Sequence, residues 1–135
     1  MKVILDTNVF VSGIFFGGPP HRILVAWREG VIALVLSSEI LEECRRVAGI
    51  LAAQFPPIDL RAILALVERG AEHHEAPRLL EPVCDDPDDD KFLACAIASE
   101  VTLIVSGDKH LLRISGFRGI QVLKPRTFVD TYLGV

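Results

Sequence analysis

Residues 1–8 have the sequence MKVILDTN, and the rest of the fold is organised around them. Residues 3–5 form an apolar run that is too short for an ordinary helix, and such a run is typical of a strand buried on both faces of a parallel sheet. The run ends in the polar side chains of Asp6, Thr7 and Asn8. Ligands of open α/β sheets bind outside the carboxyl ends of the strands, so these three residues predict a functional site at that edge of the sheet.

The remainder of the chain alternates strand patterns with helix patterns. Strands are expected over residues 31–36, 71–76, 102–106 and 120–123, and helices over 9–16, 19–29, 38–53, 59–70, 89–99, 109–114 and 125–133, with Pro56-Pro57 separating two of the helices. This alternation predicts a single domain, residues 1–135, built as a three-layer α/β/α sandwich around a central, mainly parallel sheet.

Acidic residues occur at three places that this fold would bring together. Asp6 follows the first strand, Asp108 follows the strand over residues 102–106, and the run DDPDDD at residues 85–90 opens a helix. At roughly 100° per residue, Asp90 shares the inward stripe of that helix, while Asp88 and Asp89 are left to cap the helix or to face solvent.

A fourth acid is expected from the helix that begins near Ser38. Its apolar stripe is made of Ile40, Leu41, Cys44, Val47, Ala48 and Leu51. Glu43 borders this stripe, whereas Glu42 points to the far side and Glu39 lies farther away than Glu43. Helical spacing therefore selects Glu43 as the inward carboxylate.

Converging carboxylates repel one another unless a cation neutralises them. Oxygen ligands favour Mg²⁺ or Mn²⁺ over zinc, so the pattern predicts a metal site with the ligands Asp6, Glu43, Asp90 and Asp108. Nearby polar groups would orient these carboxylates or metal-bound waters: Thr7, Asn8 and Ser106. The alternative is that each acid is an ordinary helix cap or turn residue.

Charge and composition limit the function classes. A net charge of −4 argues against a protein that binds nucleic acid through an overall positive potential. A bound metal ion can still bring phosphates to an acidic site. The cysteines Cys44, Cys84 and Cys95 lack metal-finger spacing and fit a reducing compartment. No stretch approaches the roughly 18 apolar residues of a membrane span, so we expect a soluble, cytoplasmic protein.

Four segments resemble, in order, the motifs of PIN-domain ribonucleases. They are LDTNV (5–9), SSEILEECRRV (37–47), DPDDDKFLACAIAS (86–99) and IVSGDKHLL (104–112). Within that family the chain is most similar to the VapC-type toxins of bacterial and archaeal toxin–antitoxin pairs. The resemblance implies a PIN-like, Rossmann-like fold and places the family's acids at Asp6, Glu43, Asp90 and Asp108, with Glu42 as the alternative if the helix register differs.

The resemblance further implies a Mg²⁺- or Mn²⁺-dependent endoribonuclease that hydrolyses phosphodiester bonds of RNA with water. It implies a homodimer silenced by a small antitoxin protein. Basic side chains near the last motif, among them Lys109, His110 and Arg113, could contact RNA phosphates or form a solvated helix face.

Three other classes stay open at this point. A haloacid-dehalogenase-like phosphatase would need a second aspartate at the position of Asn8, and a response-regulator receiver would need an aspartate where the second strand ends in Ser37-Ser38. The third class is a non-catalytic metal- or RNA-binding module.

Overall fold

The computed structural model describes residues 1–55 and 58–134. In that part of the chain, parallel strands form one five-stranded sheet in the order β3-β2-β1-β4-β5. The strands are β1 (Lys2–Leu5), β2 (Ala33–Leu36), β3 (Glu72–His73), β4 (Leu103–Val105) and β5 (Gln121–Leu123). Since every strand runs the same way, all carboxyl ends lie at one edge of the sheet.

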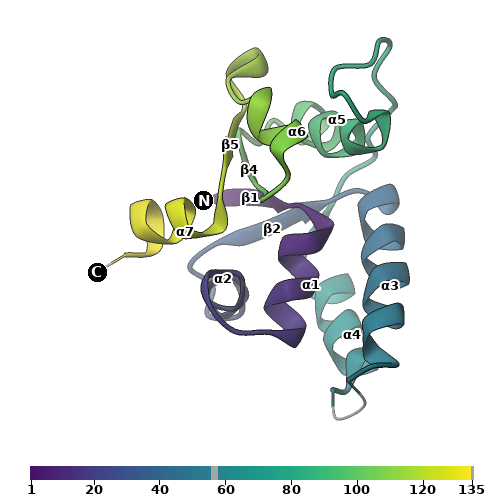
Figure 1. Ribbon diagram of the computed structural model, residues 1–135, viewed down its shortest axis with the longest axis vertical. Helices are drawn as coiled ribbons and strands as arrows, with labels where there is room; N and C mark the ends of the chain where they lie inside the picture. Colours follow the sequence, from purple (N-terminus) through teal and green to yellow (C-terminus); the bar gives the residue numbers. More distant parts are fainter. Residues whose placement is uncertain (56–57, 135) are drawn as a thin grey trace.

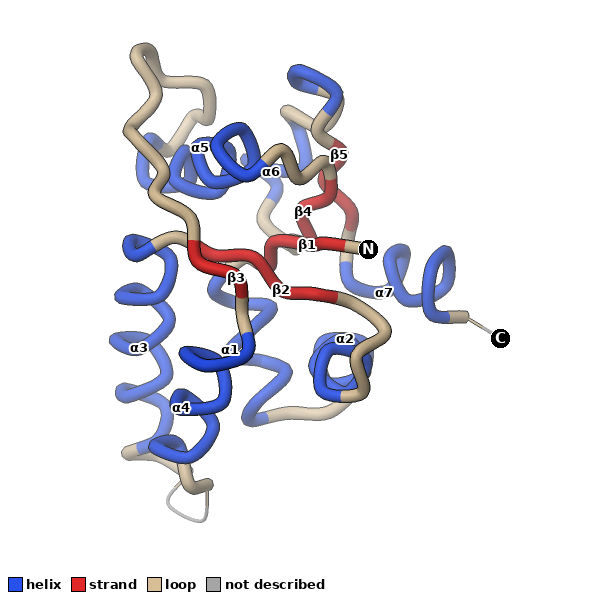
Figure 2. The backbone as a smooth tube through the Cα atoms, turned by 180° about the vertical axis from the view of Figure 1, so that it is seen from behind, coloured by secondary structure: helices blue, strands red, loops and turns tan. Residues whose placement is uncertain are grey.

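Helices cover both faces of this sheet. They are α1 (Thr7–Phe15), α2 (Pro19–Arg28), α3 (Ser38–Ala52), α4 (Leu60–Gly70), α5 (Asp90–Ser99), α6 (Lys109–Arg113) and α7 (Pro125–Phe128), which a π-helical turn, Val129–Leu133, continues. Figure 1 and Figure 2 show α5 and α6 on one side of the strands and α1 to α4 on the other. The predicted three-layer α/β sandwich is confirmed.

The local sequence signals act as expected at the helix starts. The hydroxyl of Ser37 accepts a hydrogen bond from the backbone N–H of Ile40 at 3.3 Å, and the carboxylate of Asp59 accepts one from Ala62 at 3.2 Å. Each such cap stabilises its helix by about 1 kcal/mol. The predicted break at Pro56-Pro57 lies outside the described residues.

The centre of the sheet is wholly apolar. Val3 and Ile4 of β1 and Ile104 and Val105 of β4 are fully buried. Leu5 pairs with Val105, and the backbone N–H of Asp6 donates to the Val105 carbonyl at 2.9 Å. This register fixes the first residues beyond β1 beside those beyond β4.

The cysteines Cys44, Cys84 and Cys95 are free and buried, as expected of small apolar residues in a core. Among the described residues, no single helix has the length and apolarity to cross a membrane. Only α1 and α2 taken together would pass that test, and they meet at an angle of 88°.

Candidate metal centre

The carboxyl ends of β1 and β4 are joined by a buried hydroxyl. Ser106, which is completely buried, donates from its Oγ to Oδ2 of Asp6 at 2.6 Å. The same Oγ accepts a hydrogen bond from the backbone N–H of Asp108 at 2.9 Å. Ser106 therefore links two of the predicted acids, which are 102 positions apart in the sequence but lie on neighbouring strand ends.

The Asp6 carboxylate lies in an environment that disfavours its charge. Only 5% of the residue is exposed, and this burial raises the pKa of Asp6 above its ordinary value. The Ser106 hydroxyl and the backbone N–H of Asn8 lower that pKa, but Asp108 and Glu43 raise it further by repulsion. A buried acid near other acids is the situation that a bound cation relieves.

The adjacent aspartates Asp89 and Asp90, at the start of α5, have different surroundings. A 3₁₀ turn, Pro87–Asp89, leads into α5 and is capped by Asp86, whose carboxylate accepts from the backbone N–H of Asp88 at 3.0 Å. As a result Asp89 makes no cap bond at the start of α5.

The Asp90 carboxylate is bound by the loop that precedes α5. Its two oxygens accept hydrogen bonds from the backbone N–H groups of Val83 at 3.0 Å and Cys84 at 2.8 Å. Asp90 thus holds the preceding loop against α5, whereas its neighbour Asp89 lies beside Asp108.

The helical phase of α5 does not show which of Asp89 and Asp90 faces the strand ends. Asp90 precedes Leu93 and Ala94 by three and four positions, and Asp89 stands in the same relation to Phe92 and Leu93, all of which are buried. Which of the two acids faces the strand ends depends on the 3₁₀ turn and on the loop that Asp90 binds.

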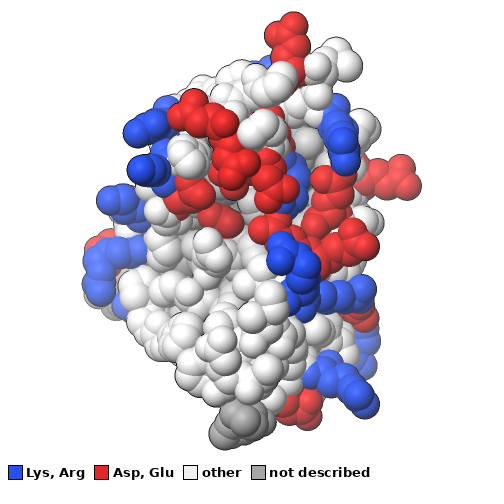
Figure 3. Space-filling model, turned by 45° about the vertical axis from the view of Figure 1, so that its right-hand side comes forward, with Lys and Arg blue, Asp and Glu red and all other residues white. Residues whose placement is uncertain are grey.

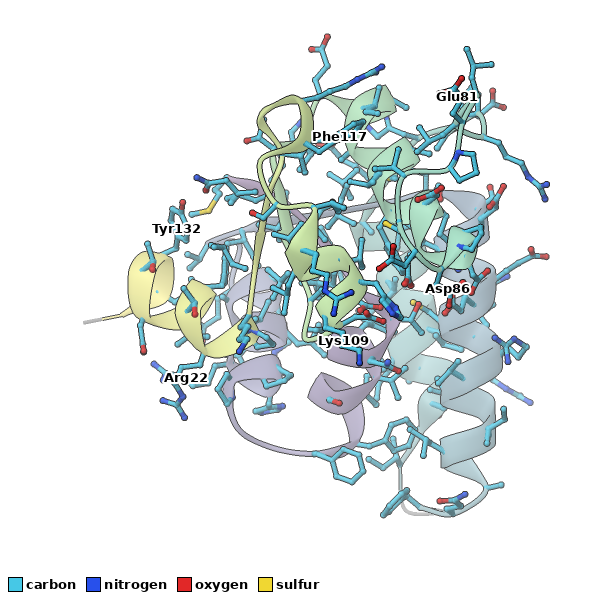
Figure 4. The ribbon with its side chains drawn as sticks, turned by 45° about the horizontal axis from the view of Figure 1, so that its top comes forward. Arg22, Glu81, Asp86, Lys109, Phe117 and Tyr132 are labelled. Atoms are coloured by element: carbon cyan, nitrogen blue, oxygen red, sulfur yellow. The ribbon has the colours of Figure 1, made fainter. Side chains whose placement is uncertain are left out.

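Asp89, Asp108 and His110 each bring one possible metal-ligand atom into a common space, with these atoms all within 4.8 Å of one another. The Nδ1 atom of His110 lies 3.4 Å from Oδ1 of Asp108 and 3.8 Å from Oδ2 of Asp89. In Figure 4, the labelled Lys109 marks the start of α6 and the labelled Asp86 marks the turn that precedes α5.

One oxygen of this cluster has no partner. Oδ2 of Asp89 is buried, and no hydrogen-bond donor among the described residues reaches it. Burial, together with repulsion from Asp108, Asp6 and Asp86, raises the pKa of Asp89 to about 6, while His110 lowers it. A buried carboxylate oxygen without a donor is costly, and a divalent cation would satisfy it.

Glu43 faces inward, as helical phase predicted. It is half-buried, whereas Glu39 and Glu42 are exposed. Its carboxylate pairs with the ammonium of Lys91, a side chain that is only 9% exposed. Burial alone would lower the pKa of Lys91, but its bonds to Glu43 and Asp88 outweigh that effect and raise it.

The three polar residues that were expected to orient the acids, Thr7, Asn8 and Ser106, lie in different surroundings. Thr7 is buried, and its hydroxyl oxygen accepts a long contact from the Cys44 thiol on α3, with S and O 4.0 Å apart. Asn8 is exposed on α1. Of the three residues expected to orient the acids, only Ser106 donates to one of them through its side chain among the described contacts.

Figure 3 shows acidic side chains gathered on one part of the surface, flanked by lysines and arginines. An all-parallel sheet with helices on both faces and buried acids at its carboxyl edge defines a Rossmann-like α/β protein with a candidate metal centre.

The family follows from a direct match. Residues 2–110 match the PIN domain, and the chain belongs to the PIN-domain family. PIN domains are generally metal-dependent nucleases acting on RNA or other nucleic acid. The matched region contains Asp6, Glu43, Asp89, Asp108 and His110. No curated protein matches the chain.

Proposed function

We propose that this protein is an endoribonuclease that uses Mg²⁺ or Mn²⁺ to hydrolyse phosphodiester bonds within RNA. The observation that carries the proposal is the buried, unpartnered Oδ2 of Asp89 beside Asp108 and His110. Membership of the PIN-domain family supports the nuclease class, and the intact acids support activity rather than a non-catalytic binding role.

The proposed metal holders are Asp6, Asp89 and Asp108. All three have carboxylates at the edge where β1, β4 and the start of α5 meet. Repulsion from Asp108 raises the pKa of both Asp6 and Asp89, and repulsion from Asp6 also raises that of Asp89. Glu43 adds negative charge at the same edge, since it also acts on Asp6. Asp90 is assigned a structural role because both of its oxygens are occupied by backbone N–H groups.

The cation and the protein would have different parts in the proposed hydrolysis. When bound, the cation would polarise the phosphodiester and lower the pKa of water. The chain's part is to hold the carboxylates in position: Ser106 orients Asp6, and the N-cap bond from the His110 backbone N–H, at 2.7 Å, orients Asp108. Burial of Asp6 keeps water from competing for its oxygens.

An RNA strand could approach along the side of Glu43. A hollow there is lined by Arg46, Arg78 and Lys91 together with Glu39, Glu42 and Asp88. Arginine and lysine side chains at such a position can bind phosphates on either side of the cleaved bond. Because the hollow also carries four carboxylates and the overall charge is −4, the bound cation would supply the main attraction for RNA.

We further propose that the protein is the toxin of a type II toxin–antitoxin pair, acting in the cytoplasm as a homodimer of single-domain chains and inhibited by a small antitoxin. An exposed aromatic pair supports a surface for a protein partner: Phe16 and Phe55 are 50% and 36% exposed and pack edge to face. Expression should arrest growth, and the Asp6→Asn variant should not.

The direct test is cleavage of an end-labelled RNA of mixed sequence with Mg²⁺, Mn²⁺ or EDTA. Metal-dependent cutting by the wild type, lost in Asp89→Asn and kept in Asp90→Asn at a temperature where both are folded, would support the proposal. Metal binding without cleavage of any RNA would instead favour a non-catalytic binding module.

A further inference from the structure

His110 is placed beside the acids by α6, of which it is the second residue. It lies in the first turn of α6, two residues after Asp108. Its backbone N–H donates to Oδ1 of Asp108 at 2.7 Å, and this bond holds the imidazole on the same side as the carboxylates. The side chain is about one-third exposed, so the ring closes part of the edge without sealing it.

The ring nitrogen lies near both carboxylates without a short hydrogen bond to either. Nδ1 lies 3.4 Å from Asp108 Oδ1 and 3.8 Å from Asp89 Oδ2, which is longer than an ordinary N–H···O hydrogen bond. Around an octahedral ion with bonds of about 2.1 Å, adjacent ligand atoms are about 3.0 Å apart and opposite ones about 4.2 Å. The observed separations fall between these two values.

We propose that the Nδ1 atom of His110 is a ligand of the cation held by Asp89 and Asp108, which makes this an oxygen site with one nitrogen. This inference rests on the proposed function for the presence of a cation. An imidazole ligand favours divalent transition metals such as Mn²⁺, whereas Mg²⁺ prefers oxygen ligands alone. The histidine therefore shifts the metal preference of the site from Mg²⁺ towards Mn²⁺.

His110 has an alternative role with the opposite consequence. As an imidazolium it would be a positive counter-ion for Asp89 and Asp108, and a positive charge beside the acids repels a metal ion. Removing a counter-ion would strengthen metal binding, while removing a ligand would weaken it. The sign of the change in affinity separates the two roles.

The experiment is calorimetric titration of the metal-free protein with Mn²⁺ and, separately, with Mg²⁺. The variants are His110→Ala and His110→Gln. The control is His73→Ala, which removes an imidazole on the edge strand β3, away from the cluster, where it bonds the Glu68 carbonyl of α4. We expect Mn²⁺ affinity to fall about tenfold or more in both His110 variants, Mg²⁺ affinity to change by less than about threefold, and the control to match the wild type.

A spectroscopic measurement on the same samples reports the bond itself. Electron spin-echo spectra of bound Mn²⁺ should show the ¹⁴N coupling of a directly bound imidazole in the wild type and in His73→Ala, and should lose it in the His110 variants. Unchanged or tighter Mn²⁺ binding in His110→Ala, or the absence of this coupling in the wild type, would overturn the inference.

These outcomes are distinguishable from failure of the proposed function. If Mn²⁺ supports RNA cleavage but no imidazole coupling is seen, the nuclease proposal stands and the ligand assignment falls. If the coupling is present but no RNA is cut, the ligand assignment stands and the nuclease proposal falls.

Discussion

The Oγ of Ser106 lies 2.6 Å from Oδ2 of Asp6, and this single hydroxyl also accepts the backbone N–H of Asp108 at 2.9 Å. The bond joins the carboxyl ends of two neighbouring parallel strands. It also supplies the hydrogen bond that most lowers the pKa of the buried Asp6 carboxylate. Ser106 thereby fixes the relative positions of two acids that the proposed metal centre requires.

Replacing this serine should weaken the centre. In Ser106→Ala, Asp6 keeps its burial and loses its donor, so its pKa should rise further and Mn²⁺ affinity should fall about 10- to 100-fold. Stability should fall by about 1–3 kcal/mol, which chemical denaturation in EDTA would measure.

The matched control is Ser99→Ala, since the Ser99 hydroxyl donates to the Cys95 carbonyl at 2.6 Å within α5. Its Mn²⁺ affinity should equal that of the wild type. Equal Mn²⁺ affinities in Ser106→Ala and Ser99→Ala would show that the hydroxyl does not position the centre.

Adjacent substitutions at the start of α5 should have opposite effects. Asp89→Asn should reduce Mn²⁺ affinity and cleavage about 100-fold or more, while leaving the metal-free protein at least as stable, because it removes a buried charge that its neighbours repel. Asp90→Asn leaves one backbone N–H of the loop without an acceptor and should cost about 1–3 kcal/mol of stability with little effect on metal affinity. Mn²⁺ titration and chemical denaturation of both variants would measure these effects. A large loss of Mn²⁺ affinity in Asp90→Asn, with little loss in Asp89→Asn, would instead make Asp90 the metal ligand.

The stability of the metal-free protein should depend on pH through Asp89. Its pKa is about 6 in the folded chain, against about 3.9 for an unperturbed aspartate, so the folded state binds the extra proton. This contribution to stability is complete below pH 4 and is lost as the pH rises through 6.

Thermal unfolding in EDTA across pH 4–8 would measure this effect as a difference between wild type and Asp89→Asn. The variant should gain melting temperature relative to the wild type as the pH rises, and Mn²⁺ should restore the wild type above pH 6. A difference that stays constant across this range would contradict the raised pKa.

The positive charge of Lys91 should lower the affinity of the site for Mn²⁺. Its ammonium neutralises Glu43, so Lys91→Met should increase Mn²⁺ affinity by about threefold or more through the loss of one nearby positive charge. The metal-free variant should be less stable because Glu43 loses its partner. Lys2→Met removes an exposed lysine that pairs with Glu72 at the start of β1, and it is the control. Weaker Mn²⁺ binding in Lys91→Met than in Lys2→Met would mean that Lys91 instead holds Glu43 in a metal-binding position.

Much of this arrangement follows from local sequence patterns. An apolar run that ends in Asp6 and another that ends in Ser106 are sufficient to predict parallel strands whose carboxyl ends meet. The phase of α3 correctly separates the half-buried Glu43 from the exposed Glu39 and Glu42. In these cases one regular element determines the direction of the side chain.

The remainder depends on contacts that no single element encodes. Asp90 is withdrawn from the cluster by the backbone of Val83 and Cys84, and Thr7 turns towards Cys44 on α3. His110 was predicted only as a possible phosphate contact. The signal that could have identified it is its position two residues after Asp108, in the first turn of a helix that follows a buried strand.

The central claim is that the acids at the carboxyl edge of the sheet hold a cation for RNA hydrolysis. The most direct measurement is cleavage of a labelled RNA by the wild type and Asp6→Asn, with Mn²⁺ titrated from zero and with binding followed in the same samples. We expect cutting that rises with Mn²⁺ occupancy in the wild type, and neither cutting nor tight binding in Asp6→Asn. Equal cutting by both proteins, or cutting by the wild type in EDTA, would contradict it.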